Sequence, residues 1–171
     1  MTVALEPLAR KHLPGVEDLL RDPKVLHFTR VPEPPPANFA KAWLSRYESG
    51  RREGTREGFA VVDGGGEFLG LALVPRVDRE GRTAELGYIV APAARGRGVA
   101  TEALRLLTKW ALEELGMLRL ELLIGVQNDA SKRVAERSGY RREGLLRSVH
   151  LKQGRREDTE IWSRLADDPE P

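Results

Sequence analysis

The sequence predicts a mixed α+β domain organised around one β-sheet. Apolar residues recur at helical spacing in four segments, whereas other segments alternate between apolar and polar residues with a period of two. Three alternating segments follow one another between residues 58 and 90, separated only by short glycine-containing turns. The 171 residues suffice for one domain with a buried core. We therefore expect a single domain over residues 1–166 and a disordered acidic tail over residues 167–171.

Composition excludes several kinds of site. The chain contains no cysteine, so disulfides, thiolate metal sites and a cysteine nucleophile are excluded. Its three histidines, His12, His27 and His150, are far apart in the sequence, and we expect no metal site. No apolar run reaches membrane-spanning length and the N-terminus lacks a signal-peptide pattern, so we expect a cytoplasmic protein without membrane contact. The net charge of +2 gives no requirement for nucleic acid.

The N-terminal third is expected to contain one strand and two helices. A strand over residues 3–8 precedes a helix over residues 13–20, and Pro23 is expected to bound that helix. The proline-rich stretch over residues 32–36 cannot be helix interior and predicts an extended connection. A second helix is expected over Asn38–Gly50, with the Asn38 side chain as its cap.

The middle of the chain predicts an antiparallel meander. The turn sequences Asp63–Gly66 and Asp78–Gly81 separate three expected strands. These strands lie at residues 59–62, 67–77 and 83–90. Strands joined by tight turns of this kind pair in antiparallel order.

The last part of the chain predicts a crossover and a closing hairpin. A helix over residues 99–114 ends near Gly116 and is followed by a strand over residues 118–126. Because strand–helix–strand connections are right-handed crossovers, we expect this strand to lie parallel to the one at 83–90. A final helix and two strands are expected at residues 129–138, 140–146 and 157–164.

A glycine-rich segment, Arg95-Gly96-Arg97-Gly98-Val99-Ala100, stands where the helix over 99–114 begins. Its glycines let backbone N–H groups approach an anion, and the helix N-terminus with Arg95 and Arg97 adds positive charge, which suits a pyrophosphate. A tight turn without a ligand is the alternative. A dinucleotide fingerprint is excluded because five residues separate the strand from the loop and Thr101 replaces the third glycine.

Several motifs in this order resemble those of the GNAT N-acetyltransferases, whose pyrophosphate motif reads Arg/Gln-x-x-Gly-x-Gly/Ala. The segment from Arg95 to Ala100 fits every defined position of that motif. Residues 84–90 resemble the family's central strand. Residues 128–140 resemble the helix and the glycine–aromatic step that follow the next strand. Residues 142–144 and 154–158 resemble the last motifs of the RimJ/RimL-like branch. The resemblance covers about residues 3–165, and members of that branch acetylate N-terminal amines of ribosomal proteins.

The resemblance implies a GNAT fold: a central, mostly antiparallel twisted sheet of about six to seven strands flanked by about four helices. It implies acetyl-CoA as co-substrate, no metal, and a primary amine as acceptor, either a ribosomal-protein N-terminus or a small-molecule amine. Two alternatives are a non-catalytic acyl-CoA-binding or RNA-associated module and an acetyltransferase that detoxifies an antibiotic or toxin. The closing strands could support a homodimer, although no motif requires one.

Acetyl transfer needs a base for the amine, and Glu85 is the candidate because its strand leads to the glycine-rich segment. The alternative for Glu85 is a strand glutamate paired with an arginine. The resemblance implies that the backbone of Ile89 and Val90 meets the thioester oxygen and the pantetheine amides. Where many family members carry a tyrosine as proton donor for the leaving thiolate, this chain has Ala135. The resemblance then points to Ser131 as that donor.

Five further residues have more than one interpretation. Asn128 is expected to hold the pantetheine arm, to cap the helix over 129–138, or both. Arg133 and Arg137 lie one helical turn apart and could reach a CoA phosphate. Trp43 and Tyr47 are expected to pack in the core rather than wall an acceptor groove. The predicted cofactor-binding set is therefore Ile89, Val90, Arg95, Gly96, Arg97, Gly98, Val99, Ala100, Asn128 and Ser131.

Overall fold

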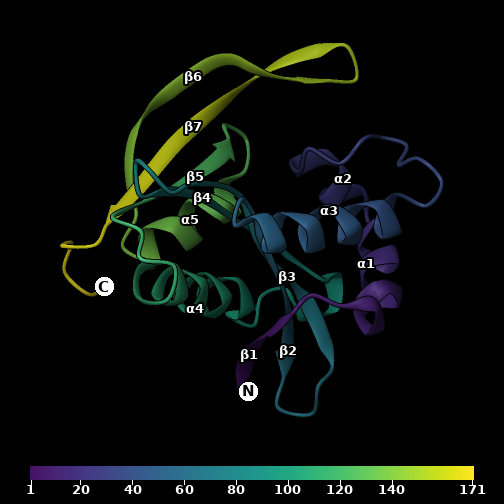
Figure 1. The fold of residues 1–171 in the computed structure, drawn as a ribbon. Coiled ribbons are helices and arrows are strands. Elements are labelled where there is room, and N and C mark those ends of the chain that lie inside the picture. Colours follow the sequence, from purple (N-terminus) through teal and green to yellow (C-terminus); the bar gives the residue numbers. More distant parts are fainter.

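In a computed structural model that describes residues 1–171, the strands form one seven-stranded sheet in the order β1-β2-β3-β4-β5-β7-β6 (Figure 1). The strands are β1 (Val3–Pro7), β2 (Glu57–Asp63), β3 (Phe68–Asp78), β4 (Thr83–Val90), β5 (Arg119–Gly125), β6 (Arg141–Lys152) and β7 (Arg155–Leu165). Only β4 and β5 are parallel, and every other neighbouring pair is antiparallel. The predicted meander and the parallel crossover are thus confirmed.

Five α-helices flank the sheet, one more than the sequence predicts. They are α1 (Leu13–Leu19), α2 (Pro23–Phe28), α3 (Phe39–Glu53), α4 (Val99–Glu113) and α5 (Asp129–Arg137), with short 3-10 helices η1 (Arg10–His12) and η2 (Pro92–Ala94). Helices α4 and α5 pack with one apolar cluster on one face of the sheet. Helices α1, α2 and α3 pack with a second cluster on the other face. The domain limits expected from the sequence stay a prediction, although Asp168 accepts a hydrogen bond from Leu165 N (2.8 Å).

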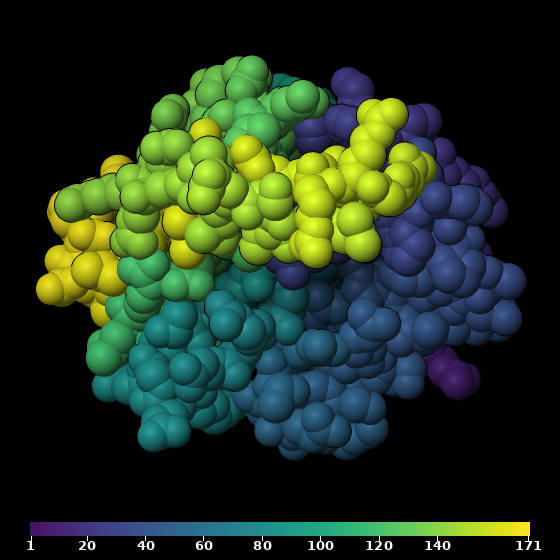
Figure 2. Space-filling model, turned by 90° about the horizontal axis from the view of Figure 1, so that it is seen from above, coloured from purple at the N-terminus to yellow at the C-terminus, as the bar shows by residue number.

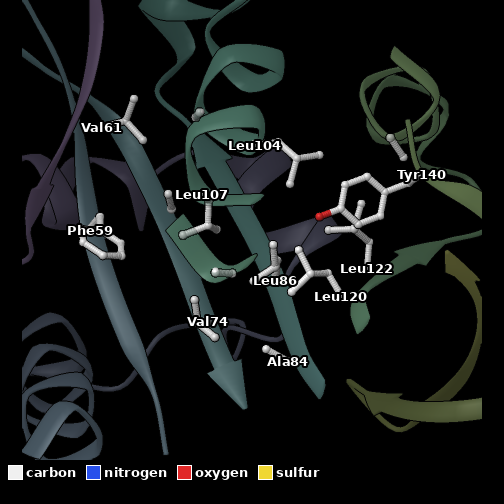
Figure 3. Packing of buried hydrophobic residues seen from close by; sticks show 14 of the residues in the cluster. Phe59, Val61, Val74, Ala84, Leu86, Leu104, Leu107, Leu120, Leu122 and Tyr140 are labelled. Atoms are coloured by element: carbon white, nitrogen blue, oxygen red, sulfur yellow. The ribbon is translucent and has the colours of Figure 1, made fainter. Parts of the chain in front are cut away.

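The apolar layer beneath α4 explains the alternation of apolar residues in β4 and β5. Leu104 and Leu107 of α4 are fully buried and lie against Leu86, Leu120 and Leu122 of the two parallel strands (Figure 3). Burying a leucine of this kind stabilises the fold by about 1.5–3 kcal/mol. Alternation turns the odd-numbered residues of β4 to the opposite face, which carries the polar side chains discussed below.

Tyr140 belongs to the same apolar layer, as the sequence suggests. Its side chain is buried, and its hydroxyl shares a 2.8 Å hydrogen bond with Thr108 Oγ1. Burial raises the pKa of Tyr140 well above its ordinary value. A phenol buried in this way is a packing residue with its one polar atom satisfied.

Helix α2 is missing from the sequence prediction, and the treatment of Pro23 as a boundary explains the error. Pro23 occupies the first turn of α2, where its missing N–H costs nothing, and Asp22 is the N-cap that accepts from Lys24 N (3.1 Å).

The predicted side-chain cap at Asn38, at the start of α3, is also wrong. Asn38 stands at the N-cap position with φ 62° and makes no side-chain cap bond. Helix α3 ends at Glu53, beyond the expected Gly50, because Gly54 adopts φ 72° there.

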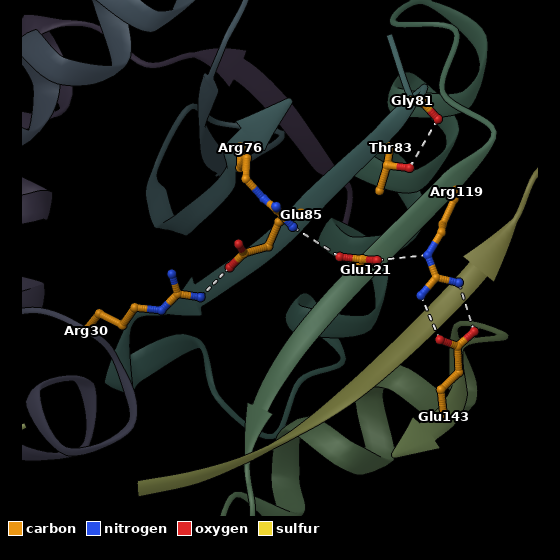
Figure 4. Close-up of polar contacts among 8 residues, drawn as sticks. All are labelled: Arg30, Arg76, Gly81, Thr83, Glu85, Arg119, Glu121 and Glu143. Carbon is orange, nitrogen blue, oxygen red and sulfur yellow. Dashed lines mark hydrogen bonds and ion pairs between the residues drawn. The ribbon is translucent and has the colours of Figure 1, made fainter. Parts of the chain in front are cut away.

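The closing strands are longer than the alternation predicts and form a hairpin that arches over the domain (Figure 1). Ionic hydrogen bonds join the base of this hairpin to β5. Arg119 of β5 binds both carboxylate oxygens of Glu143 on β6, at 2.9 and 2.6 Å (Figure 4). Ser163 of β7 donates to the same carboxylate at 2.5 Å. These bonds lower the pKa of Glu143 to about 2, with Arg119 the larger cause and Ser163 the second.

The depressed pKa of Glu143 makes stability depend on pH. Relative to an ordinary value of 4.5, the carboxylate stabilises the fold fully above about pH 4.5, and that contribution is lost as the pH falls towards about 2. We expect Glu143→Gln to give a shallower decline of the free energy of unfolding across this interval, measured by urea denaturation at stepped pH. Glu136→Gln, at an exposed position of α5, is the matched control and should keep the native slope. An identical slope for both variants would contradict the prediction.

Candidate functional site

The two parallel strands separate halfway along their length. Strands β4 and β5 pair only from Thr83–Leu86 with Arg119–Leu122. Beyond that point, β4 stays paired with β3 as far as Val90, and β5 stays paired with β7 as far as Gly125. The sheet therefore opens between its two halves, and each strand presents backbone that has lost its neighbour.

Alternation decides which amides of β4 face this opening. The Ala91 N–H donates to Leu69 O of β3 at 2.8 Å, so the amide of Ile89, two residues earlier, also faces β3. The amides of Tyr88 and Val90 point the other way, into the opening. In agreement, Val90 O accepts a hydrogen bond from Arg95 Nε at 3.2 Å rather than from β3. Of the two backbone donors predicted from the sequence, Val90 faces the opening and Ile89 does not.

The glycine-rich segment lies where β4 leads into α4. Gly96 and Gly98 adopt φ 72° and 78°, in the left-handed region that favours glycine, and Gly98 is the N-cap residue of α4. A Cβ added at either glycine would meet no atom within 4 Å. The first amides of α4, from Val99 onward, thus border open space at the positive end of the helix. This cradle fits a pyrophosphate.

A cavity of about 590 Å³, here called the loop cavity, lies over this segment. The glycine-rich segment lines it on one side and α5 on the other. Lys24, Arg133 and Arg137 also line it, and Arg133 and Arg137 are exposed. These cations supply charge for a polyphosphate beyond that of the helix terminus.

Arg95 is turned inward and ties the segment to α2. Its guanidinium forms an ion pair with Asp22, the N-cap of α2, while its Nε donates to Val90 O. Burial opposes ionisation of Asp22, but Arg95 and the Lys24 amide outweigh burial and lower the pKa of Asp22. Arg97 lies on the outside, with Nη2 3.0 Å from Met1 Sδ. Arg95 therefore holds the loop in place through Asp22 and Val90, and it also lines the loop cavity.

A second cavity of about 490 Å³, here called the strand cavity, lies on the α3 side of the opening. Both predicted catalytic residues, Glu85 and Ser131, line it. The strand cavity meets the loop cavity along six shared residues, Phe28, Thr29, Tyr88, Ile89, Asn128 and Ser131. Two molecules bound in the two cavities would thus meet at this boundary.

Glu85 is buried and paired. Its side chain is 9% exposed and forms an ion pair with Arg30, from the segment after α2 (Figure 4). Its neighbour in register on β5 is Glu121, which lies between Arg76 at 3.3 Å and Arg119 at 2.8 Å. The alternative interpretation, a strand glutamate paired with an arginine, is therefore met by Arg30. Glu85 nevertheless lines the strand cavity.

Three polar residues meet at the boundary between the cavities, two from the start of α5 and one from β4. Asn128 caps the helix, since its Oδ1 accepts from Ser131 N at 3.2 Å. The Ser131 side chain also lies at the Tyr88 hydroxyl, where a hydrogen bond with it partly offsets the effect of burial on the pKa of Tyr88. Tyr88, which the sequence interpretation did not select, donates its hydroxyl to Ser131 O at 3.2 Å, and burial raises its pKa to about 12. Only the register of β4 against α5 identifies Tyr88, so no local motif could reveal it.

Trp43 and Tyr47 of α3 were expected to pack in the core, and they also line the strand cavity. Tyr47 is 5% exposed and belongs to the apolar cluster on this face, and Trp43 packs against that cluster. Burial raises the pKa of Tyr47 to about 12. Both residues therefore serve the core and the cavity wall at once.

The β6–β7 hairpin covers a third cavity of about 710 Å³, here called the hairpin cavity. Figure 2 shows the yellow end of the hairpin lying against the indigo segment that contains α2. Lys152 makes this contact by donating to the carbonyls of Leu26 and Thr29 at the end of α2. The hairpin cavity is continuous with the strand cavity through residues that both share, among them Arg30 and Leu123.

No group of histidine and acidic side chains is arranged to hold a metal ion. No helix is long and apolar enough to cross a membrane.

Comparison with known proteins gives one consistent family. Residues 2–141 match the model of the acetyltransferase (GNAT) domain. YdaF of Bacillus subtilis (strain 168), provisionally named a ribosomal N-acetyltransferase, is 34% identical over 100 residues, which are 58% of this chain and 55% of YdaF. The spermidine N(1)-acetyltransferase of Escherichia coli (strain K12) is 28% identical over 145 residues, 85% of this chain and 76% of that protein. The match to YdaF thus spans about half its length.

Solved structures share the fold. RimL, a ribosomal L7/L12 α-N-protein acetyltransferase in complex with coenzyme A, superposes with a TM-score of 0.89 at 18% identity, covering 99% of this chain and 97% of RimL. Spermidine N-acetyltransferase from Vibrio cholerae, in complex with CoA and spermine, superposes with a TM-score of 0.86 at 21% identity, covering 98% and 97%.

The cradle at Gly98 can be tested by CoA binding. We expect Gly98→Glu to weaken binding of CoA about a hundredfold or more, equivalent to ~2.8 kcal/mol, because the side chain brings negative charge into the open space of the loop cavity. Isothermal titration calorimetry with CoA measures this. Gly116→Glu is the matched control: Gly116 follows the other end of α4 and has φ 73°, so the backbone strain is similar. Undiminished CoA binding by Gly98→Glu would place the pyrophosphate elsewhere.

Proposed function

The chain belongs to the GNAT acetyltransferase family, and we propose that it transfers an acetyl group from acetyl-CoA to a primary amine by direct attack in a ternary complex. One observation carries the proposal. Glu85 and Ser131 line a single cavity, and that cavity meets the glycine-lined loop cavity at Tyr88, Asn128 and Ser131. The groups that the chemistry needs therefore converge where two substrates would meet.

We assign the loop cavity to CoA. The pyrophosphate would lie on the amides of the segment from Gly96 to Ala100, with Lys24, Arg133 and Arg137 available to its phosphates. The pantetheine arm would run into the opening between β4 and β5, where an extended ligand can replace the missing strand neighbour. Val90 and Tyr88 offer the backbone groups for this, and Val90 takes the role first given jointly to Ile89 and Val90.

The amine would enter the strand cavity beside Glu85. Reaction requires the neutral amine, whose lone pair attacks the thioester carbonyl carbon, and Glu85 would accept the proton directly or through water. Arg30 remains in the wall of the strand cavity after the amine has replaced it at Glu85, and a nearby guanidinium disfavours the ammonium form of the amine. The oxyanion that forms would be stabilised by a backbone N–H in the opening, and we assign this role to Val90.

The tetrahedral intermediate collapses by breaking the C–S bond, and the departing CoA thiolate takes up a proton. We assign the donor role to the Ser131 hydroxyl, since Ser131 lines both cavities, and the serine regains its proton from water. Tyr88 acts on this group indirectly, because its bond to Ser131 O fixes the first turn of α5. The products are an amide and free CoA thiol, and no covalent enzyme intermediate forms.

The acceptor we propose is a primary amine, either a protein N-terminus or a small-molecule amine. The names of YdaF and RimL point to ribosomal proteins, and two other relatives are named for spermidine. An α-amine, with a pKa near 8, is neutral far more often at neutral pH than a side-chain amine with a pKa near 10.4. This difference favours an N-terminal amine for a site with one carboxylate base.

We also propose that the protein forms a homodimer through β6. This strand is at the edge of the sheet and exposes three apolar side chains, Leu145 (44%), Val149 (40%) and Leu151 (65%). Edge strands with exposed apolar residues are common pairing surfaces. Light scattering coupled to size exclusion measures the mass in solution.

Release of CoA thiol from acetyl-CoA, followed with a panel of N-terminal peptides and small amines, tests the activity. Acetylation of at least one acceptor, confirmed by the mass of the product, is the expected result. Tight CoA binding without turnover on any acceptor would favour instead the non-catalytic acyl-CoA-binding module.

The role of Ser131 is tested by its own variant. We expect Ser131→Ala to lower kcat about a hundredfold, because the thiolate loses its proton donor, while the Kd for CoA stays within about twofold. Ser45→Ala, at an exposed position of α3 outside the cavities, is the control and should leave both quantities unchanged. A native kcat for Ser131→Ala would remove this hydroxyl from the mechanism.

A further inference from the structure

The charge that lines the strand cavity is strongly unbalanced. Glu85 is the single acidic residue among the residues that line it, whereas four arginines do so: Arg30, Arg46, Arg56 and Arg76. No lysine or histidine lines it. An acceptor in this cavity therefore experiences a positive electrostatic potential, independently of which residue deprotonates its amine.

Two of the four guanidinium groups are already balanced. Arg30 pairs with Glu85, and Arg76 pairs with Glu121 at 3.3 Å. Arg46 and Arg56 have no carboxylate within ion-pair distance. Arg56 is held by its Nε, which donates to Pro75 O at 3.0 Å, and its terminal nitrogens remain free. Arg46 makes no hydrogen bond within the chain.

Arg46 and Arg56 flank the same aromatic wall of the cavity. Both guanidinium groups act on Tyr47, where their charge opposes the effect of burial, and Glu85 acts on the same hydroxyl. The two unpaired arginines, the proposed base and Tyr47 thus line one cavity. A guanidinium with free terminal nitrogens is suited to bind a carboxylate through two parallel hydrogen bonds.

We propose that the acceptor carries a carboxylate on the same molecule as its primary amine, and that Arg46 and Arg56 bind this carboxylate while the amine lies beside Glu85. The proposal rests on the acetyltransferase function proposed above and specifies its substrate class. Within the strand cavity a polyamine is disfavoured, because its additional ammonium groups would lie among four arginines while Glu85 is the single carboxylate there. Further carboxylates, Glu33, Glu157 and Asp158, line only the adjoining hairpin cavity.

The carboxylate can belong to an acidic residue near a peptide N-terminus or to a small amino acid. The strand cavity continues into the hairpin cavity along shared residues, including Thr29, Val31 and Gly125, which leaves space for a chain to extend. Both sources share the recognised chemistry, so the experiment includes one arm for each.

The test uses the full chain and matched peptides with amidated C-termini: Ser-Glu-Glu-Gly, Ser-Gln-Gln-Gly and Ser-Lys-Lys-Gly. Free glutamate and spermidine are the small-molecule arms. We measure kcat/KM by thiol release and, separately, peptide binding to the CoA-loaded protein by calorimetry. The acidic peptide should have a kcat/KM about tenfold or more above that of the neutral and cationic peptides, and it should bind about tenfold or more tightly. Glutamate should exceed spermidine by a similar factor in both quantities.

Arg46→Glu should abolish or invert this preference, and this exposed residue forms no hydrogen bond or ion pair that the substitution would break. Arg56→Glu should act in the same direction. Arg52→Glu is the matched control on α3, because Arg52 is exposed outside the cavity and bonds only Ser49 Oγ (3.1 Å), so its preference should stay native.

The two proposals fail in different ways. Turnover without charge preference, or with preference for the lysine peptide or spermidine, would overturn the carboxylate proposal and leave the acetyltransferase function standing. Preferential binding of the acidic peptide or glutamate, lost in Arg46→Glu but without turnover, would uphold carboxylate recognition and refute the activity. Binding that does not discriminate between the charges overturns the carboxylate proposal whether or not turnover occurs.

Discussion

The separation of β4 from β5 is the constraint on which both halves of the site depend. Each strand keeps its outer partner, β3 or β7, so the fold loses no more than a few hydrogen bonds at the opening. Backbone groups that would otherwise pair across a parallel ladder become available to an extended ligand. Helix α5 begins at the same place, and the bond from Tyr88 to Ser131 O joins it to β4 across the opening. The sheet thus provides a binding edge in its interior, where both faces can contribute side chains, instead of at its margin.

Helix α2 connects the parts that surround this opening, although it has only six residues. At its start, Asp22 caps the helix and holds Arg95 of the glycine-rich segment. At its end, two carbonyls receive Lys152 of the β6–β7 hairpin, and the next residues bring Arg30 to Glu85. Each contact joins segments far apart in the sequence, so α2 fixes the loop, the hairpin and the base relative to one another. A displacement of α2 would change all three together.

Local patterns in the sequence predict most of the fold but little of this network. Strand β4 and the start of α4 were predicted at Thr83–Val90 and Val99 because alternation and helical spacing are strong there. Helix α2 was missed because Pro23 is equally compatible with the end of one helix and the first turn of the next. The glycine-rich segment was placed correctly, yet the inward turn of Arg95 depends on Asp22, 73 positions away. Tyr88, Arg46 and Arg56 carry no motif, and only the packing of α3 and α5 on the sheet brings them to the cavity.

The Glu85 side chain is fixed in place, whereas its ion-pair partner Arg30 can be displaced, and this combination suits a catalytic base. Its own side chain is 9% exposed and fixed by the strand, whereas that of its partner Arg30 is 55% exposed. Because Arg30 is half exposed, its guanidinium can be hydrated when it leaves, whereas the buried carboxylate then needs a new partner, which the amine supplies. The other nearby carboxylate, Glu121, is shared by Arg76 and Arg119 and is not available to replace Glu85. An arriving amine can therefore take the place of Arg30 while Glu85 keeps its position, and the cavity keeps one carboxylate at the reacting nitrogen.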